Sequence, residues 1–135
     1  MADQDNTIGE SSKEEMKIWI DQDGIANVKL IKNIDMESID NLIEEGREIV
    51  RRFSGDLLVL VDITSGLIPL SSKLRKDIAG RVKELFQELT PKKVAVFGGI
   101  IARTIASFII TASGVKSDIK LFSSKEEAVK WLKQG

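Results

Sequence analysis

Two short runs of consecutive apolar residues, LLVLVDI at 57–63 and KVAVFGG at 93–99, constrain the fold more than any other feature of the chain. Such a run predicts a strand that is buried on both faces of a parallel sheet, because a strand with one wet face alternates apolar and polar residues. Between the two runs, apolar residues recur at helical spacing from Leu74 to Leu89. Neighbouring parallel strands need a crossover of this kind, so the sequence predicts an α/β fold.

The remaining segments complete a predicted order of ββαβαβαβα. Alternating runs at 16–21 and 25–31 flank Asp23-Gly24, which is a strong hairpin signal. Further helices are expected at 36–53 and 100–112, followed by a strand at 118–122 and a helix at 125–133. The predicted fold is therefore a mostly parallel five-stranded sheet with an N-terminal antiparallel hairpin and four helices, joined by right-handed crossovers.

The chain of 135 residues fits one domain, and 42% of hydrophobic residues is enough for a core of ordinary size. Residues 1–14 are polar and acidic, so we expect a flexible tail ahead of a single domain at 15–135. The start MADQDNTIGE lacks the basic and apolar parts of a secretory signal, which favours a cytoplasmic protein. The apolar segment 94–115 is interrupted by Gly98-Gly99 and Arg103, so no transmembrane segment is predicted.

Histidine, cysteine and tyrosine are all absent from the sequence. Their absence removes the commonest general base, the thiolate nucleophile and the commonest metal ligands. The sequence also shows no Walker loop, metal-ligand cluster or nucleophile–base pair. We therefore predict a protein that is not an enzyme and that needs no metal or cofactor. A formal charge of −1 and 5% aromatic residues also argue against nucleic acid, which requires a basic face and often stacking aromatics.

The pair Ser71 and Ser72 stands just before the predicted helix at 74–89, whose first turn is basic. The same letters SSK recur at 123–125, where either Ser124 with Glu127 or Ser123 with Glu126 has the spacing of a capping box. At 71–72 the acid is missing, and cations occupy the positive end of the helix dipole. Two interpretations stay open, namely an ordinary cap before a solvated basic face and a binding site for phosphate or carboxylate.

Ligands of open α/β sheets bind outside the carboxyl ends of the parallel strands. Asp62 and Thr64 end one buried strand, and a Gly-Gly pair ends the next and leads into the helix that carries Arg103. We expect these residues to lie along one edge with the two serines. The candidate anion or ligand site consists of Asp62, Thr64, Ser71, Ser72, Gly98, Gly99 and Arg103. Arg103 either clamps a ligand or pairs with Asp62, and the Gly-Gly pair either approaches an anion or forms a tight turn.

The predicted helix at 100–112 is apolar over most of its circumference. Its polar residues form one thin stripe, in which Arg103, Ser107 and Thr111 are spaced by four. Such a helix is either deeply buried in the monomer or part of a self-association surface.

The order of elements, with LLVLVDIT, LSSKLRKDIAG, PKKVAVFGG, ARTIASFI and LFSSKEEAVKWL, resembles the SpoIIAA-like superfamily of STAS and Sec14-type domains. The resemblance covers nearly everything after the tail and is closest to an uncharacterised branch of the superfamily. It implies a regulatory or protein-interaction domain. In the anti-sigma-factor antagonists of this superfamily, a partner kinase phosphorylates a serine in an Asp-Ser-Ser-Gly-Leu stretch. The resemblance places that serine at Ser72, although Leu70 and Lys73 replace the acid and the glycine.

Three hypotheses for function follow. The first is a non-enzymatic domain that works through a protein partner or as a homodimer, using the edge around Ser71 and Ser72 and the apolar third helix. The second is a carrier of a small anionic ligand or lipid in the Sec14 manner, with an apolar cavity under that helix and Arg103 on the anionic head. A hydrolase that uses Asp62 and a serine is the weakest of the three, because no histidine is present to act as the base.

Overall fold

The computed structural model describes residues 16–30, 36–53, 55–65, 71–115 and 118–134. Five strands form one sheet, and their order in space, β1-β2-β3-β4-β5, is also their order along the chain. The first pair is antiparallel and the other three pairs are parallel, as predicted. The strands are β1 (Met16–Ile20), β2 (Ile25–Leu30), β3 (Leu58–Asp62), β4 (Lys93–Phe97) and β5 (Asp118–Phe122).

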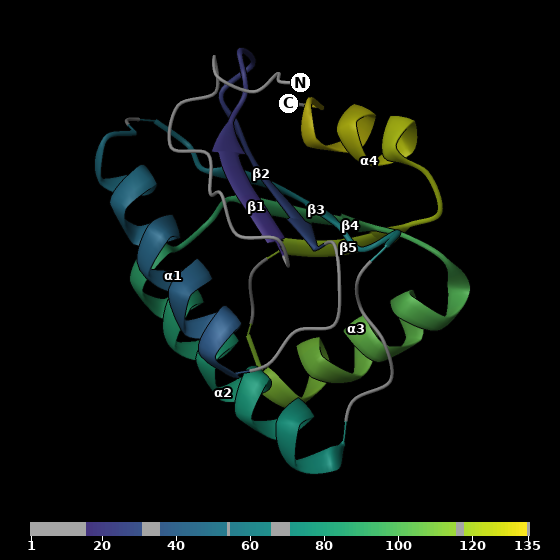
Figure 1. Cartoon of the computed structure of the whole chain (residues 1–135). Coiled ribbons are helices and arrows are strands. Elements are labelled where there is room, and N and C mark those ends of the chain that lie inside the picture. The colour runs from purple at the N-terminus through teal and green to yellow at the C-terminus, as the bar shows by residue number, and fades with distance from the viewer. Residues whose placement is uncertain (1–15, 31–35, 54, 66–70, 116–117, 135) are drawn as a thin grey trace, which may run out of the picture.

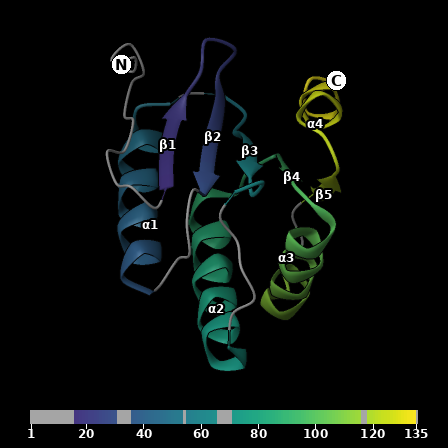
Figure 2. The ribbon, with the colours of Figure 1, turned by 45° about the vertical axis from the view of Figure 1, so that its right-hand side comes forward.

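Three helices lie side by side on one face of the sheet, and the last helix lies on the other face (Figures 1 and 2). The helices are α1 (Met36–Arg51), α2 (Ser72–Leu89), α3 (Ile100–Ser113) and α4 (Lys125–Leu132). Crossovers of one hand that always advance in the same direction must place their helices on the same face. The helix α4 follows the last strand and joins no strand pair, so it is free to cover the opposite face.

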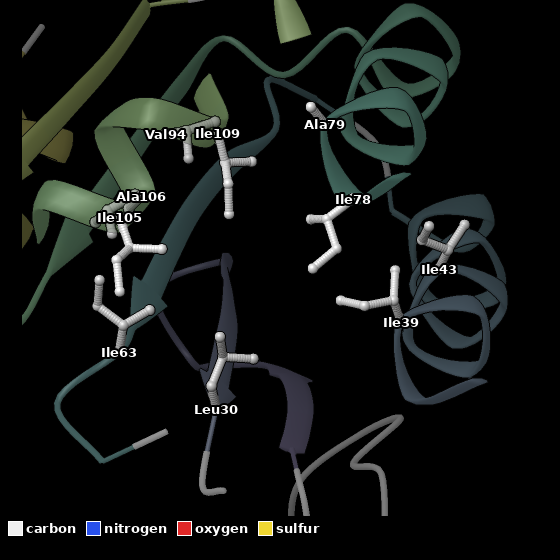
Figure 3. Close-up of a cluster of buried hydrophobic side chains, with 11 residues drawn as sticks. Leu30, Ile39, Ile43, Ile63, Ile78, Ala79, Val94, Ile105, Ala106 and Ile109 are labelled. Atoms are coloured by element: carbon white, nitrogen blue, oxygen red, sulfur yellow. The ribbon is translucent and has the colours of Figure 1, made fainter. Parts of the chain in front are cut away.

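The sheet separates two hydrophobic clusters. The larger cluster lies between the sheet and the three crossover helices (Figure 3), and its buried members are Leu30, Ile39, Ile43, Ile63, Ile78, Ala79, Val94, Val96, Ile105, Ala106 and Ile109. The smaller cluster lies under α4 and contains Ile25, Leu60, Ala95, Phe97, Ala128 and Leu132. Within β4, alternate residues belong to different clusters. This double burial explains why KVAVF is apolar without alternation.

The hairpin turn between β1 and β2 is organised by a residue that the sequence pattern did not single out. The carboxylate of Asp21 accepts hydrogen bonds from the backbone N of Asp23 at 2.9 Å and of Ile25 at 3.1 Å. Its second oxygen accepts from Asn27 Nδ2 at 2.9 Å. Gly24 takes the positive φ of 79° that closes the turn. The turn is therefore held by side-chain capping from Asp21 together with backbone hydrogen bonds from Asp21 N to Ile25 O at 3.0 Å and from Gly24 N to Asp21 O at 2.9 Å.

Most predicted element boundaries agree with the structure to within one or two residues. The first helix ends at Arg51 where 53 was predicted, and α3 runs one residue further, to Ser113. Gly114 follows it with φ 70°, which confirms this glycine as the helix stop. The predicted tail at 1–14 lies outside the described residues. Among the described helices, none combines the length and the apolar character that crossing a bilayer requires.

Candidate functional site

The carboxyl ends of β3 and β4 meet at one edge of the sheet, as the sequence predicts. Asp62 is the register partner of Phe97, and the backbone N of Ile63 donates to the carbonyl of Phe97 at 3.0 Å. A Cβ added at Gly98 would lie 2.6 Å from Ile63 Cγ1 and 3.2 Å from the carbonyl carbon of Ile63. Only glycine fits there without displacing β3, so close backbone packing is sufficient to explain Gly98.

Asp62 and Thr64 are joined to each other. One carboxylate oxygen of Asp62, Oδ1, accepts from the backbone N of Thr64 at 2.9 Å and from its hydroxyl at 2.7 Å. Arg103 does not join them, because its Nε donates to the carbonyl oxygen of Gly98 at 3.1 Å. Among the described residues, Asp62 and Arg103 form no ion pair, so the pairing weighed from the sequence is not observed. Arg103 instead ties the first turn of α3 to the end of β4.

Gly99 is the N-cap of α3 and supplies no side chain to the helix start. Its backbone is extended, with φ −69° and ψ 170°, and a Cβ there would meet nothing within 4 Å. The first turn of α3 carries no acidic residue. The two glycines therefore differ physically, since Gly98 is required by packing and Gly99 is not.

The two serines open α2, and the first of them is its cap. Ser71 Oγ accepts a hydrogen bond from the backbone N of Leu74 at 3.2 Å, while Ser72 is the exposed first residue of the helix. Two nearby cations have contacts within the protein, because Lys73 Nζ lies 3.1 Å from Asp77 Oδ2 and the Arg75 guanidinium lies 5.0 Å from the centre of the Phe108 ring. The predicted misfit between a basic turn and the helix dipole is thus partly relieved without an anion. Anion binding and phosphorylation at Ser72 stay predictions.

The structure does not join the serines to the other candidate residues. Among the described residues, no hydrogen bond or ion pair links Ser71 or Ser72 to Gly98, Gly99 or Arg103. The reason is the length of α2, whose 18 residues span about 27 Å, whereas a strand of 5 residues spans about 17 Å. The start of α2 therefore lies well away from the edge at which β3 and β4 end (Figures 1 and 2).

One face of α3 is exposed and apolar. The exposed fractions of Ile100, Ile101 and Phe108 are 72%, 66% and 48%, the opposite of what these residue types usually show. The other face of the helix contributes Ile105, Ala106 and Ile109 to the larger cluster. Of the two alternatives left open by the sequence, complete burial in the monomer is therefore wrong.

The groove between α1 and α2 has a volume of about 260 Å³ and is lined mainly by charged side chains. These charges are paired, since Arg81 Nε lies 2.8 Å from Asp40 Oδ1 and Arg47 Nη1 lies 3.7 Å from Glu44 Oε2. Arg47 Nε also lies 2.8 Å from Oε1 of Glu88, a residue of α2 outside the lining. The hydrogen bond to Asp40, aided by its charge, raises the pKa of the Arg81 guanidinium above the usual value. The groove is best explained as ion pairing between two helices at the surface.

Sequence reasoning missed a group of residues around Asp62. This carboxylate lines a pocket with Trp19, Asn27, Lys29 and Lys125, which come from three other elements. The pairing of β1 with β2 and of β2 with β3 brings the strand residues onto one face, and α4 adds Lys125. The one available signal was the alternation of polar residues at 27 and 29 within an otherwise apolar strand.

Neither a protein-family model nor a curated protein matches the sequence. Among solved structures, it is similar to an uncharacterized protein of the DUF3478 family from Shewanella loihica, described as having a SpoIIAA-like fold. The two chains are 19% identical, with a TM-score of 0.61 over 87% of this chain and 91% of the other. A chain in the complex of the diguanylate cyclase SiaD with its activator SiaC from Pseudomonas aeruginosa is 17% identical, with 83% and 96% covered. Its TM-score of 0.44 is too low to support an argument.

These findings define the class of protein at the level of fold. The chain is an α/β protein with a SpoIIAA-like fold, which confirms the resemblance seen in the sequence.

The difference between the two glycines predicts opposite effects of substitution. Gly98→Ala should lower the free energy of unfolding by about 1–3 kcal/mol, because the new methyl group overpacks against Ile63. Gly99→Ser should leave stability unchanged or raise it by a few tenths of a kcal/mol, since serine is the better N-cap. Urea denaturation of both variants would measure this. Equal losses at both positions would contradict the packing explanation.

The start of α2 yields a second prediction. Ser71→Ala should cost about 1 kcal/mol of unfolding free energy, because Leu74 N loses its acceptor. Ser72→Glu should gain about 0.3–1 kcal/mol by placing a negative charge at the positive end of the helix. Gln87→Glu, in the last turn of the same helix, is the matched control and should be neutral or destabilising. If Ser72→Glu gave no more stability than Gln87→Glu in urea denaturation, this end of α2 would have no preference for an anion.

Proposed function

We propose that this protein is a non-enzymatic protein-interaction domain and that the exposed face of α3 is its contact surface. The observation that carries the proposal is the exposure of Ile100, Ile101 and Phe108. Residues that are four, seven or eight positions apart lie on the same side of a helix. Ile100, Ile101 and Phe108 therefore lie on one side of α3, together with Thr104. Grouped large apolar side chains at a surface mark sites of protein contact.

The outer face of α3 also differs from the other helices in charge. Exposed faces of α1 and α2 carry ion pairs such as Arg51 with Glu48 and Lys73 with Asp77. In α3 the only charged residue is Arg103, whose Nε is bonded to the Gly98 carbonyl. A partner that covers Ile100 and Ile101 would therefore bury few charges of α3 itself, and the desolvation cost of binding there would be low.

A second copy of the same chain is the occupant that we propose for this face. The exposed isoleucines are complementary to themselves, because two copies related by a two-fold axis bring the same apolar side chains together. The one cation described beside this face is Arg75 of α2, whose guanidinium lies 5.0 Å from the centre of the Phe108 ring. The helix α3 stands at one end of the helical layer, with α2 on one side of it and no helix on the other in the described structure (Figure 2). A two-fold contact between two α3 helices would cover the exposed isoleucines of both copies.

As part of the same proposal, the domain has no enzymatic activity and is regulated by phosphorylation of Ser72. The chain has no histidine, cysteine or tyrosine, and the described residues contain no group of three potential metal ligands. Ser71 is used as a helix cap.

Exposure of Ser72 at the start of α2 supports it as the site at which a kinase would act. A cytoplasmic location completes the proposal and rests on the sequence alone.

The carrier of a small anionic ligand or lipid is the less supported alternative. It requires a cavity under α3, where Ile105 and Ile109 pack with Val94 and Val96 in the larger cluster. Arg103, the expected partner of the anionic head, is bonded to the protein backbone. Native mass spectrometry of gently purified protein would reveal a lipid that accompanies the chain.

Self-association through α3 is tested by its dependence on concentration. Sedimentation equilibrium should show a monomer–dimer equilibrium for the unmodified chain, and the variant Ile100→Lys/Ile101→Lys should remain monomeric because four lysines would meet in the dimer. The matched control, Gln87→Lys on the exposed surface of α2, should associate like the unmodified chain.

A chain that stays monomeric at every concentration would contradict the homodimer. A photo-crosslinking residue placed at position 101 and, as control, at position 87 then tests the wider proposal in the native host. A heterologous partner that crosslinks only from position 101 would support the α3 face as a contact surface. Equal crosslinking from positions 101 and 87 would contradict it.

A further inference from the structure

The pocket beside Asp62 lies on the sheet face opposite to α1, α2 and α3. It has a volume of about 160 Å³ and lies beside the main contacts of α4 with the sheet, which are with β3, β4 and β5. Its base is apolar, since Leu60 and Phe97 of the smaller cluster line it. The half-buried ring of Trp19 from β1 forms a side wall. An apolar base with a few polar groups around it is the usual composition of a small-molecule site.

Two lysines that line this pocket, Lys29 and Lys125, have no interaction partner among the described residues. Within the described parts of the chain, Lys29 and Lys125 have no hydrogen bond, ion pair or ring contact, although Lys29 is the register partner of Asp62. Lys92 and Lys133 differ, since Lys92 lies 3.2 Å from Asp56 and Lys133 lies 3.1 Å from Asp23, whereas Lys76, Lys83 and Lys130 also have no partner among the described residues but lie outside the pocket. The two ammonium groups are therefore available to an anionic ligand.

Two hydrogen-bond acceptors in the pocket are also unused. Asn27 is only 6% exposed, and its Nδ2 donates to Asp21 and to the carbonyl of Ile25. These two bonds fix the amide plane and leave its Oδ1 without a donor among the described residues. In Asp62 the bonds from Thr64 go to Oδ1, and Oδ2 has no described partner. A ligand that brings a donor can satisfy both acceptors.

We propose that this pocket binds a small carboxylate that also carries a hydrogen-bond donor, of the α-amino acid or 2-hydroxy acid class. The carboxylate lies between Lys29 and Lys125, the donor group faces Asp62 Oδ2 and Asn27 Oδ1, and a short apolar side chain covers Leu60. The volume is below the roughly 300–1,000 Å³ of sites for drug-sized ligands, which favours a small ligand over a nucleotide or a lipid chain. The helices α3 and α4 lie on opposite faces of the sheet (Figure 1), and the pocket is lined by Lys125 of α4, so each proposal can fail alone.

Trp19 makes the pocket directly observable. The chain has two tryptophans, so Trp131→Phe leaves Trp19 as the sole reporter of tryptophan fluorescence. We would titrate this variant with the standard amino acids, lactate, acetate and inorganic phosphate. At least one amino acid or lactate should give a saturable change, with acetate at least about tenfold weaker because it lacks the matched donor. If Trp131→Phe does not fold, calorimetry on the unmodified chain replaces fluorescence.

Substitutions then assign the binding to the pocket. Lys29→Gln/Lys125→Gln should weaken it at least about tenfold, whereas the control Lys130→Gln, in the last turn of α4 and outside the pocket, should leave it unchanged. Asp62→Asn should weaken the amino acid more than acetate. No saturable signal with any amino acid or hydroxy acid would overturn the proposal, as would binding that is insensitive to the two lysines. Tighter binding of phosphate than of any amino acid would show a simple anion site instead.

Discussion

Neighbouring parallel strands can be joined only by a segment that crosses back over the sheet, and such crossovers have one preferred hand. Here the strand order in space follows the order in the chain, so every crossover turns the same way and its helix falls on the same face. Three helices therefore lie on one face, and of the helices that the structure describes the other face carries only α4, which has 8 residues. The two clusters of the core, the larger under three helices and the smaller under one, follow from this asymmetry.

The same asymmetry determines which surfaces stay uncovered. On the crowded face, the helical layer has two ends, and α3 at one of them keeps Ile100, Ile101 and Phe108 exposed. On the sparsely covered face, the main contacts of α4 are with β3 to β5, and the pocket lined by Trp19 and Lys29 lies beside them. The first surface is apolar and almost uncharged, which suits a protein. The second is concave and carries unused cations and acceptors, which suits a small ligand.

The sequence was sufficient for the fold because local patterns and tertiary burial agree. KVAVF is apolar without alternation since both of its faces are buried, and Gly114 ends α3 at the predicted place. The site was predicted less well, because its geometry depends on lengths and register. The 18 residues of α2 carry Ser71 away from Gly98, and Arg103 bonds to a backbone oxygen that no side-chain pattern reveals. Likewise, Trp19 and Lys125 meet Asp62 only through strand pairing and the docking of α4.

Amide hydrogen exchange across α3, measured at low and at high protein concentration, tests most directly whether the uncovered end of the helical layer is a contact surface. Dimerisation through this helix should slow exchange in residues 100–113 at high concentration and leave exchange in α1 unchanged, because only α3 would gain protection. Exchange in α3 that is independent of concentration, or that slows no more than in α1, would contradict a homodimer formed through this face.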